Sequence, residues 1–299
     1  MTWRRRGGSE TRTRDTVNER RQQLAPAPPP LPVPVIDAHT HLDACGATDA
    51  EGVRATLDRA QAVGVLAVVT VADDMAAAHW VTEAAGWDQR VYAAVALHPT
   101  RATTFSEVDR AELEHLVTAP RVVAVGETGL DYYWTRADPG GCASPEAQRE
   151  AFRWHIDLAK RTGKPLMIHN RDAHSDVLAV LDQEGAPDTV VFHCFSGDVA
   201  MARRCVDAGY LLSFAGTVTF RNAKTLREAA VLVPDDQLLV ETDAPFLTPH
   251  PYRGRANEPA NLPYTVTNLA ALRGQDVLEL ADAVRRTAEQ AFGVPSPAQ

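Results

Sequence analysis

Seven side chains able to bind a metal ion follow short apolar runs that are typical of buried strands. They are His39, His41, His98, Glu127, His169, His193 and Asp243. His39 and His41 end the first run, and because alternate residues of a strand point to one face, both imidazoles can be directed at the same point. Burying so many titratable groups near one another requires a compensating cation, so the pattern predicts a metal site.

We assign six of these side chains, all except His98, to two divalent ions. The first is placed among His39, His41, Glu127 and Asp243, and the second among Glu127, His169 and His193. A glutamate between two sets of histidines can bridge ions about 3.5–4 Å apart, the geometry of two-metal phosphoryl chemistry. A water between the ions would lose a proton and act as the nucleophile, with Asp243 placed to orient or deprotonate it. Mixed imidazole and carboxylate ligands suit Mg²⁺, Mn²⁺ or Zn²⁺, and the sequence does not select among them.

Two further residues are candidates for substrate binding. Arg171, beyond the fifth apolar run, can hold a phosphate through a charge-assisted contact, or else pairs with Asp172 or another nearby acid. His98 is a candidate to contact phosphate, with a purely structural role before Pro99 as the alternative. The aromatic run at 132–134 offers rings that stack on bases or that pack beneath a loop.

The candidate side chains require a fold that brings many strand ends together. Eight apolar runs predict strands at residues 33–36, 65–71, 91–97, 122–126, 165–168, 189–192, 210–213 and 238–240. Amphipathic stretches between and after them predict helices at 51–63, 75–85, 106–118, 145–162, 175–183, 199–208, 222–230, 263–272 and 276–292. This alternation implies an α/β protein with parallel strands covered by helices, and eight such units favour a single TIM-like (β/α)8 barrel. Active sites of such barrels lie at the carboxyl ends of the strands, where the candidates occur.

The composition is that of one globular domain with a tail. Residues 1–31, rich in Arg and Pro, are expected to form a disordered extension, and residues 32–295 the barrel. The formal net charge of −9 argues against a tightly binding, sequence-specific DNA-binding protein. It does not exclude a nuclease, in which metal cations attract phosphate locally. Four scattered cysteines indicate reduced thiols and a cytoplasmic protein. No membrane span and no stable protein partner are expected.

Several stretches of the chain are similar to those of the TatD family of metal-dependent deoxyribonucleases, within the amidohydrolase-like metallohydrolases. The matching stretches are IDAHTHLD at 36–43, VGETGLDYY at 125–133, PLMIH at 165–169, FHCFSG at 192–197, ETDAPFL at 241–247 and RGRANEP at 253–259. The resemblance covers residues 34–293 and implies a TIM-like barrel with a two-metal site made of the six ligands above. It also implies hydrolysis of DNA phosphodiester bonds, with 3′–5′ exonuclease activity on single strands or 3′ ends as the expected form. Residues 134–144 are expected to form a mobile loop over the rim.

Two other functions stay open at this point. A hydrolase of small amide, ester or lactone substrates would use the same metal scaffold. Such enzymes of this superfamily often bridge their ions with a carbamylated lysine, whereas Glu127 stands at the relevant strand end here and Lys164 precedes its strand. A non-enzymatic barrel that has lost activity is disfavoured by the six intact ligand types. The native metal, strand and polarity preference, activity on RNA and oligomeric state are not determined by the sequence.

Overall fold

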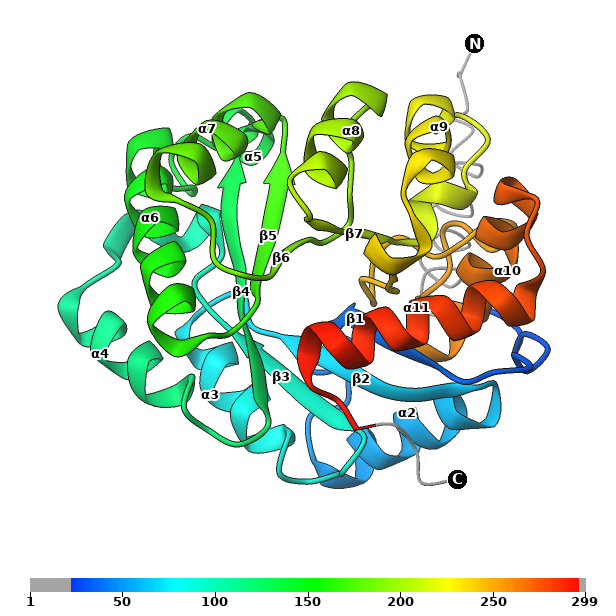
Figure 1. The fold of residues 1–299 in the computed structure, drawn as a ribbon. Coiled ribbons are helices and arrows are strands. Elements are labelled where there is room, and N and C mark those ends of the chain that lie inside the picture. The colour runs from blue at the N-terminus through cyan, green and yellow to red at the C-terminus, as the bar shows by residue number, and fades with distance from the viewer. Residues whose placement is uncertain (1–22, 296–299) are drawn as a thin grey trace, which may run out of the picture.

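Eight parallel strands form the centre of this computed structural model, which describes residues 23–295 (Figure 1). They are β1 (Val35–Thr40), β2 (Val65–Val71), β3 (Val91–Val95), β4 (Val122–Asp131), β5 (Leu166–Arg171), β6 (Val190–Phe192), β7 (Leu211–Phe214) and β8 (Leu238–Val240). Each strand pairs in parallel with the next. Just past β8, the N–H of Asp243 donates to the carbonyl of His39 at 2.9 Å, so the last strand meets the first. The predicted TIM-like barrel is confirmed.

Helices surround the strands (Figure 1). They are α2 (Ala50–Ala62), α3 (Met75–Ala84), α4 (Glu107–Leu116), α5 (Tyr132–Ala137), α6 (Pro145–Thr162), α7 (His174–Glu184), α8 (Val199–Asp207), α9 (Lys224–Leu232), α10 (Leu262–Arg273) and α11 (Val277–Phe292). Many begin after an Asp or Ser whose side chain accepts an N–H of the first turn, such as Asp49 before α2 and Ser144 before α6. Such caps satisfy N–H groups that have no partner inside the helix.

The apolar core has two large parts and a small third cluster around Leu97. One large part lies between the strands and the surrounding helices, and the other fills the inside of the barrel. Ile36, Val69, Met167 and Leu239 belong to the inner cluster, which Phe292 of α11 joins. The barrel is therefore packed with side chains rather than hollow, as in other barrels of this type.

Two irregularities of the sheet coincide with candidate ligands. The pairing register shifts within residues 37–40 of β1 and within residues 125–128 of β4. An extra residue in one strand bends it and changes the direction of a side chain. One of these bulges contains His39 and the other contains Glu127. The backbone thus turns both side chains away from the regular alternation of a strand.

Three strands end at least three residues later than the sequence predicted. They are β1, β4 and β5, which contain His39, Glu127 and His169. The prediction placed these residues beyond the strand ends because the apolar pattern stops there. The backbone pairing nevertheless continues into the polar residues, so these side chains are held by a hydrogen-bonded sheet.

The first part of the predicted tail, residues 1–22, lies outside the described residues. From residue 23 the chain contacts the barrel. Leu24 forms a parallel bridge with Ala256, and the buried Leu31 donates its N–H to the carbonyl of Val63 at 3.1 Å. Residues 23–31, part of the extension expected to be disordered, are therefore attached to the barrel at Leu24 and Leu31, although Leu24 is 43% exposed. Within residues 23–295, none of the helices has the length and apolar character needed to cross a bilayer.

The segment expected to be a mobile loop over the rim is held at both ends. Helix α5 opens it, with the Asp131 carboxylate accepting the N–H of Trp134 at 2.7 Å. The fully buried Gln148 donates to the Thr135 hydroxyl at 2.7 Å and to the Ala143 carbonyl at 3.0 Å. A buried amide with these partners is costly to displace, so the segment is an ordered wall of the mouth.

Candidate metal centre

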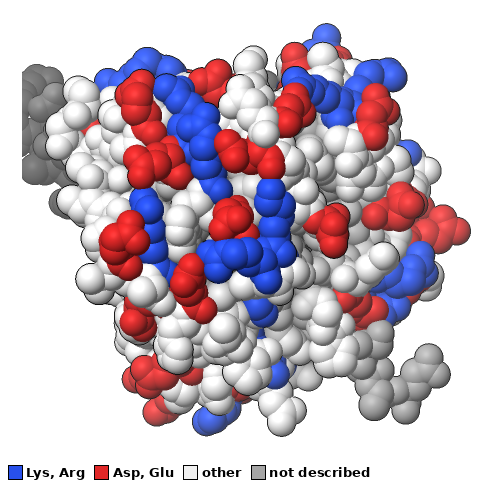
Figure 2. Space-filling model, turned by 60° about the vertical axis from the view of Figure 1, so that its left-hand side comes forward, with Lys and Arg blue, Asp and Glu red and all other residues white. Residues whose placement is uncertain are grey.

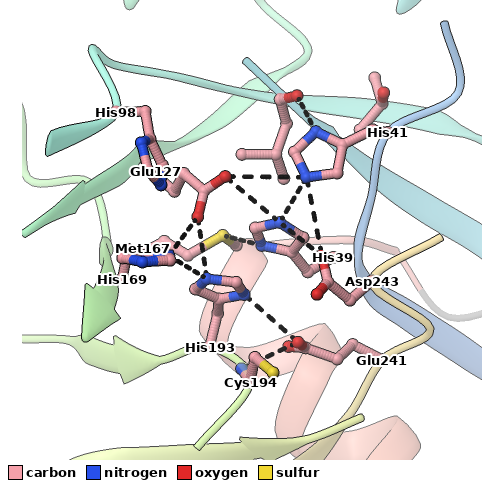
Figure 3. Close-up of polar contacts among 12 residues, drawn as sticks. His39, His41, His98, Glu127, Met167, His169, His193, Cys194, Glu241 and Asp243 are labelled. Carbon is pink, nitrogen blue, oxygen red and sulfur yellow. Dashed lines mark hydrogen bonds and ion pairs between the residues drawn. The ribbon is translucent and has the colours of Figure 1, made fainter. Parts of the chain in front are cut away.

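Four candidate donor atoms surround one point at the mouth of the barrel (Figure 3). The Nε2 atoms of His39 and His41 lie 3.2 Å apart, and Oδ1 of Asp243 lies 3.7 Å from each. Oε1 of Glu127 lies 3.9 Å from Nε2 of His39 and 3.7 Å from Nε2 of His41. Tetrahedral ligands about 2.1 Å from an ion are separated by about 3.4 Å, close to the distances from either carboxylate oxygen to the two histidine nitrogens.

The other oxygen of Glu127 faces a second pair of histidines. Its Oε2 lies 2.8 Å from Nε2 of His193 and 3.1 Å from Nδ1 of His169, and these two nitrogens lie 3.3 Å apart. The rings of His39 and His193 are stacked with centroids 3.9 Å apart, so the two groups are adjacent. Figure 3 shows the Glu127 carboxylate between the two groups. The structure thus brings together all six side chains that the sequence assigned to the ions.

Buried carboxylates orient the second pair of histidines. Nε2 of His169 lies 3.0 Å from Oδ2 of Asp131, and Nδ1 of His193 lies 3.3 Å from Oε1 of Glu241. A ring nitrogen that donates to a carboxylate leaves the opposite nitrogen free to bind a cation. Both histidines therefore have a fixed orientation and a defined nitrogen facing Glu127.

The sequence reasoning did not select Asp131 or Glu241 as site residues. A signal was available, because Asp131 follows Glu127 by four residues and Glu241 precedes Asp243 by two. Even spacing along an extended chain places side chains on one face. His41 has an orienting partner that no side-chain pattern reveals, since its Nδ1 lies 3.0 Å from the carbonyl oxygen of Val71.

The junction of β1 and β8 positions His39 and Asp243. Asp37, fully buried, accepts a hydrogen bond from the N–H of Thr242 at 2.8 Å and another from its hydroxyl. Asp243 follows with φ of 50°, a left-handed conformation that Asp adopts more readily than most residues. Burial raises the pKa of Asp37 to about 8, although the bonds from Thr242 act against this.

Strong electrostatic coupling joins the clustered groups when no cation is bound. Burial, the largest influence, disfavours the charge on Glu127, yet His193 and the other imidazoles bring its pKa well below the usual range. Burial likewise favours neutral histidines, but the carboxylates raise the pKa of His193 well above its usual value and that of His41 to about 9. Protons on imidazoles thus compensate the buried carboxylates, a role that a bound cation would take over.

His98 lies in the mouth beside the second group. Its ring centroid is 4.4 Å from that of His169, and donor atoms of His98, Glu127 and His169 lie within 4.8 Å of one another. Burial, together with the nearby His169, lowers the pKa of His98 to about 3, so its ring is neutral. Nδ1 accepts the N–H of Thr100 at 3.2 Å, which leaves the proton on Nε2. His98 therefore combines a structural contact with a free N–H donor.

Arg171 lies at the rim, at the end of β5. Its guanidinium carbon lies 4.0 Å from the centroid of the Tyr133 ring. Arg171 does not form the alternative ion pair with Asp172, because Asp172 pairs with Arg136. Within residues 23–295, no carboxylate lies within ion-pair distance of Arg171.

A cavity of about 400 Å³ opens beside the candidate metal centre. Its lining includes His41, Asp73, His98, Arg101, Glu127, Trp134 and Phe246. The cavity therefore gives a ligand access to Glu127 from the rim, between loops that follow several strands.

Comparison with known proteins identifies the family. The model of the family described as TatD related DNase matches residues 36–293. The chain belongs to the TatD family. A relative from Mycobacterium tuberculosis, named as an uncharacterized metal-dependent hydrolase TatD, is 66% identical over 87% of this chain and 98% of its own length. A TatD homologue of known structure, YjjV from Escherichia coli, superimposes with a TM-score of 0.80 at 32% identity, over 87% of this chain and 98% of its own.

Another TatD relative has a name that states a substrate. The protein from Erwinia billingiae named as a 3′-5′ ssDNA/RNA exonuclease TatD is 37% identical over 67% of this chain and 77% of its own length. Together with its metal-dependent relatives, the chain is a hydrolase of the TatD family, and its His, Glu and Asp side chains cluster where a metal can bind.

Proposed function

We propose that this TatD-family hydrolase cleaves DNA phosphodiester bonds as a 3′–5′ exonuclease on single strands. The observation that carries the proposal is the position of Glu127, whose two oxygens face two separate groups of donors. A carboxylate in this position would suit two divalent ions, and two-metal sites stabilise both the attacking and the leaving oxygen in phosphoryl transfer. The name of the Erwinia billingiae relative adds support for a nucleic-acid substrate with a free 3′ end.

In this proposal two divalent ions are held by the six side chains predicted from the sequence. They are His39, His41, Glu127 and Asp243 for one ion, and Glu127, His169 and His193 for the other. The donor set fits such ions, because each histidine nitrogen lies 2.8–3.9 Å from a carboxylate oxygen of its group. Divalent ions bound here supply Lewis acidity and a lowered pKa for water. Imidazole and carboxylate donors are compatible with Mg²⁺, Mn²⁺ or Zn²⁺.

The residues of the chain have distinct roles in hydrolysis. Asp243 is the more accessible carboxylate, with 14% of its side chain exposed against 5% for Glu127, and it accepts the proton of the attacking water. Glu127 fixes the positions of the two groups of donors relative to each other. His98 donates from Nε2 to a nonbridging phosphate oxygen. One P–O bond forms to the water oxygen and the P–O3′ bond breaks. The terminal nucleotide leaves with a 5′-phosphate, and the O3′ of the shortened strand takes up the proton that Asp243 accepted.

The alternative proposal is hydrolysis of a small amide, ester or lactone on the same scaffold. The carboxylate bridge of Glu127 favours phosphodiesters over these substrates without excluding them. A cytoplasmic location is also part of the proposal, since it follows from the cysteine pattern, and all four cysteines are free thiols.

The test is hydrolysis by the metal-loaded protein. Single-stranded DNA labelled at the 5′ end is incubated beside the same DNA with a blocked 3′ end and a panel of amides and lactones. We expect stepwise shortening of the open strand, and no reaction with the panel. Cleavage of the panel without cleavage of DNA would favour the alternative. Loss of DNA cleavage in Asp243→Ala and Glu127→Ala ties the activity to this centre, whereas unchanged cleavage would place it elsewhere.

A further inference from the structure

We propose that Tyr133, Trp134 and Arg171 form a binding platform for an unpaired nucleotide next to the one being removed. This inference rests on the proposed nuclease function, because it concerns how a DNA strand is held at the same mouth. The three residues are defined here as the rim platform. Its rings would stack on a base, and its guanidinium would pair with a phosphate.

The rim platform is close to the candidate metal centre. Arg171 follows His169 by two residues on β5, so both side chains point to the same face of the strand. Trp134 lines the cavity that also reaches His41, His98 and Glu127. A strand whose terminal nucleotide occupies this cavity would therefore pass over Trp134 on leaving it.

The chemistry of the rim platform matches a nucleotide. The guanidinium carbon of Arg171 lies 4.0 Å from the ring centroid of Tyr133 and 5.7 Å from that of Trp134. Tyr133 is 41% exposed and Trp134 is 45% exposed, although both are large aromatic residues. Stacking on aromatic rings and on arginine is the usual way in which proteins hold unpaired bases. Because Arg171 has no carboxylate partner within the described residues, its charge is available to phosphate.

The rim platform is also rigid before substrate arrives. The N–H of Trp134 donates to Asp131, the same carboxylate that orients His169. The Thr135 hydroxyl donates to the carbonyl of Asp131 at 2.8 Å, and buried Gln148 anchors Thr135 in turn. One buried carboxylate therefore links the aromatic helix to a candidate ligand. A preorganised surface loses little conformational entropy on binding.

The outer surface around α6 carries charges that are largely paired with one another. Figure 2 shows a face on which basic and acidic side chains are interleaved. On α6, Arg149 pairs with Glu146 and Arg153 pairs with Glu184. Charges already paired in this way attract a phosphate backbone weakly, which favours the mouth as the route of the strand.

Kinetics with two phosphodiesters test the rim platform. The metal-loaded protein is given a short single-stranded oligonucleotide and, separately, bis(p-nitrophenyl) phosphate, which has neither a neighbouring base nor a second phosphate. We expect Trp134→Ala and Arg171→Ala each to raise KM for the oligonucleotide about 10-fold with kcat nearly unchanged. Hydrolysis of the small diester by Arg171→Ala, whose side chain is not part of the cavity lining, should stay within about twofold of wild type. Arg203→Ala, an exposed arginine on α8, is the matched control and should change neither substrate.

An abasic substrate isolates the stacking contribution. An oligonucleotide lacking the base next to the terminal nucleotide should bind the wild type about 10-fold more weakly, and Trp134→Ala should have no further effect on it. Equal KM values for wild type and both platform variants with the intact oligonucleotide would overturn the inference. A loss of activity toward the small diester as large as the loss toward the oligonucleotide would also overturn the inference, since it would indicate damage to the metal centre.

Binding measured without turnover separates this inference from the proposed function. A labelled oligonucleotide is titrated with wild type and variants in EDTA, followed by fluorescence anisotropy. Weaker binding by Trp134→Ala and Arg171→Ala supports the rim platform even if the protein fails to cleave DNA. Equal affinity of the wild type and both variants, or no binding by the wild type, refutes it.

Discussion

Nε2 of His169 lies 3.0 Å from Oδ2 of the buried Asp131, and this contact determines which nitrogen of the imidazole faces Glu127. Burial, the largest influence on Asp131, favours its neutral form, but His169 and the N–H of Trp134 bring its pKa below the usual value. An ionised Asp131 therefore accepts the Nε2 proton. The lone pair of Nδ1 is then directed at the place assigned to the second ion.

Replacement of Asp131 by Asn is expected to weaken binding of the second ion by about 10–100-fold, because His169 loses its charged orienting partner. Calorimetric titration with Mn²⁺ or Zn²⁺ measures the affinities of the two ions separately. Asp157→Asn, which removes an exposed partner of Arg161 on α6, is the control and should leave both affinities unchanged. Identical titration curves for Asp131→Asn and wild type would show that this carboxylate does not orient a ligand.

Replacement of Glu127 by Gln is expected to lower kcat/KM by about 1,000-fold, since a neutral amide cannot serve both ions and metal catalysis contributes several kcal/mol. Metal content after dialysis should fall with the activity. Glu112→Gln alters an exposed glutamate near His79 and serves as the comparison. Full metal content with full activity in Glu127→Gln would disprove the bridging role.

Metal binding at pH 7 is expected to release about two protons. With no cation bound, burial favours neutral rings, but the carboxylates raise the pKa of His41 to about 9 and that of His193 well above its usual value. Both rings are then protonated at pH 7, and a cation binds only the neutral ring, so affinity should increase as the pH rises to about 9. Calorimetry in buffers of different ionisation enthalpy measures the release. Heats that do not depend on the buffer would contradict it.

The raised pKa values of the same two histidines predict how the stability of the metal-depleted protein depends on pH. A histidine whose pKa is higher in the folded state than its unfolded value of about 6.5 stabilises the fold when it is protonated. This stabilisation is complete below about pH 6.5 and is lost as the pH rises through the folded-state pKa. The melting temperature in EDTA should therefore fall between about pH 6.5 and pH 9 by way of His41. Metal-loaded protein should not show this decline. Parallel melting curves with and without EDTA across this range would argue against charged rings in the cluster.

Replacement of Gly126 by Ala is expected to destabilise the protein by about 1–3 kcal/mol, the usual effect of overpacking. An added Cβ would lie 2.5 Å from Cβ of Met167, whose sulfur lies 3.1 Å from Nδ1 of His39. Urea unfolding measures the free energy. Gly140→Ala is the matched control, because no atom lies within 4 Å of its added Cβ. Equal destabilisation in the two variants would mean that crowding at Gly126 is relieved by the backbone.

Local signals in the sequence were sufficient to predict the barrel and the residues that cluster at its mouth. Apolar runs alternating with amphipathic stretches reveal the strands and helices, and polar residues just after those runs reveal the mouth. The six candidate ligands and His98 were found in this way. The same signals misplaced the strand ends at His39, Glu127 and His169, because an apolar pattern stops where side chains become polar, whereas backbone pairing does not.

The tertiary structure alone decided how the donors are oriented and held. The bulge at residues 125–128 turns Glu127 so that each oxygen faces a different pair of histidines. Asp37 joins β1 to Thr242, the second residue after β8, across 205 positions of the chain. Such contacts have no local signature, since they depend on the closure of the barrel. A sequence states which side chains reach the mouth, but the distances among them follow from the packing of distant strands.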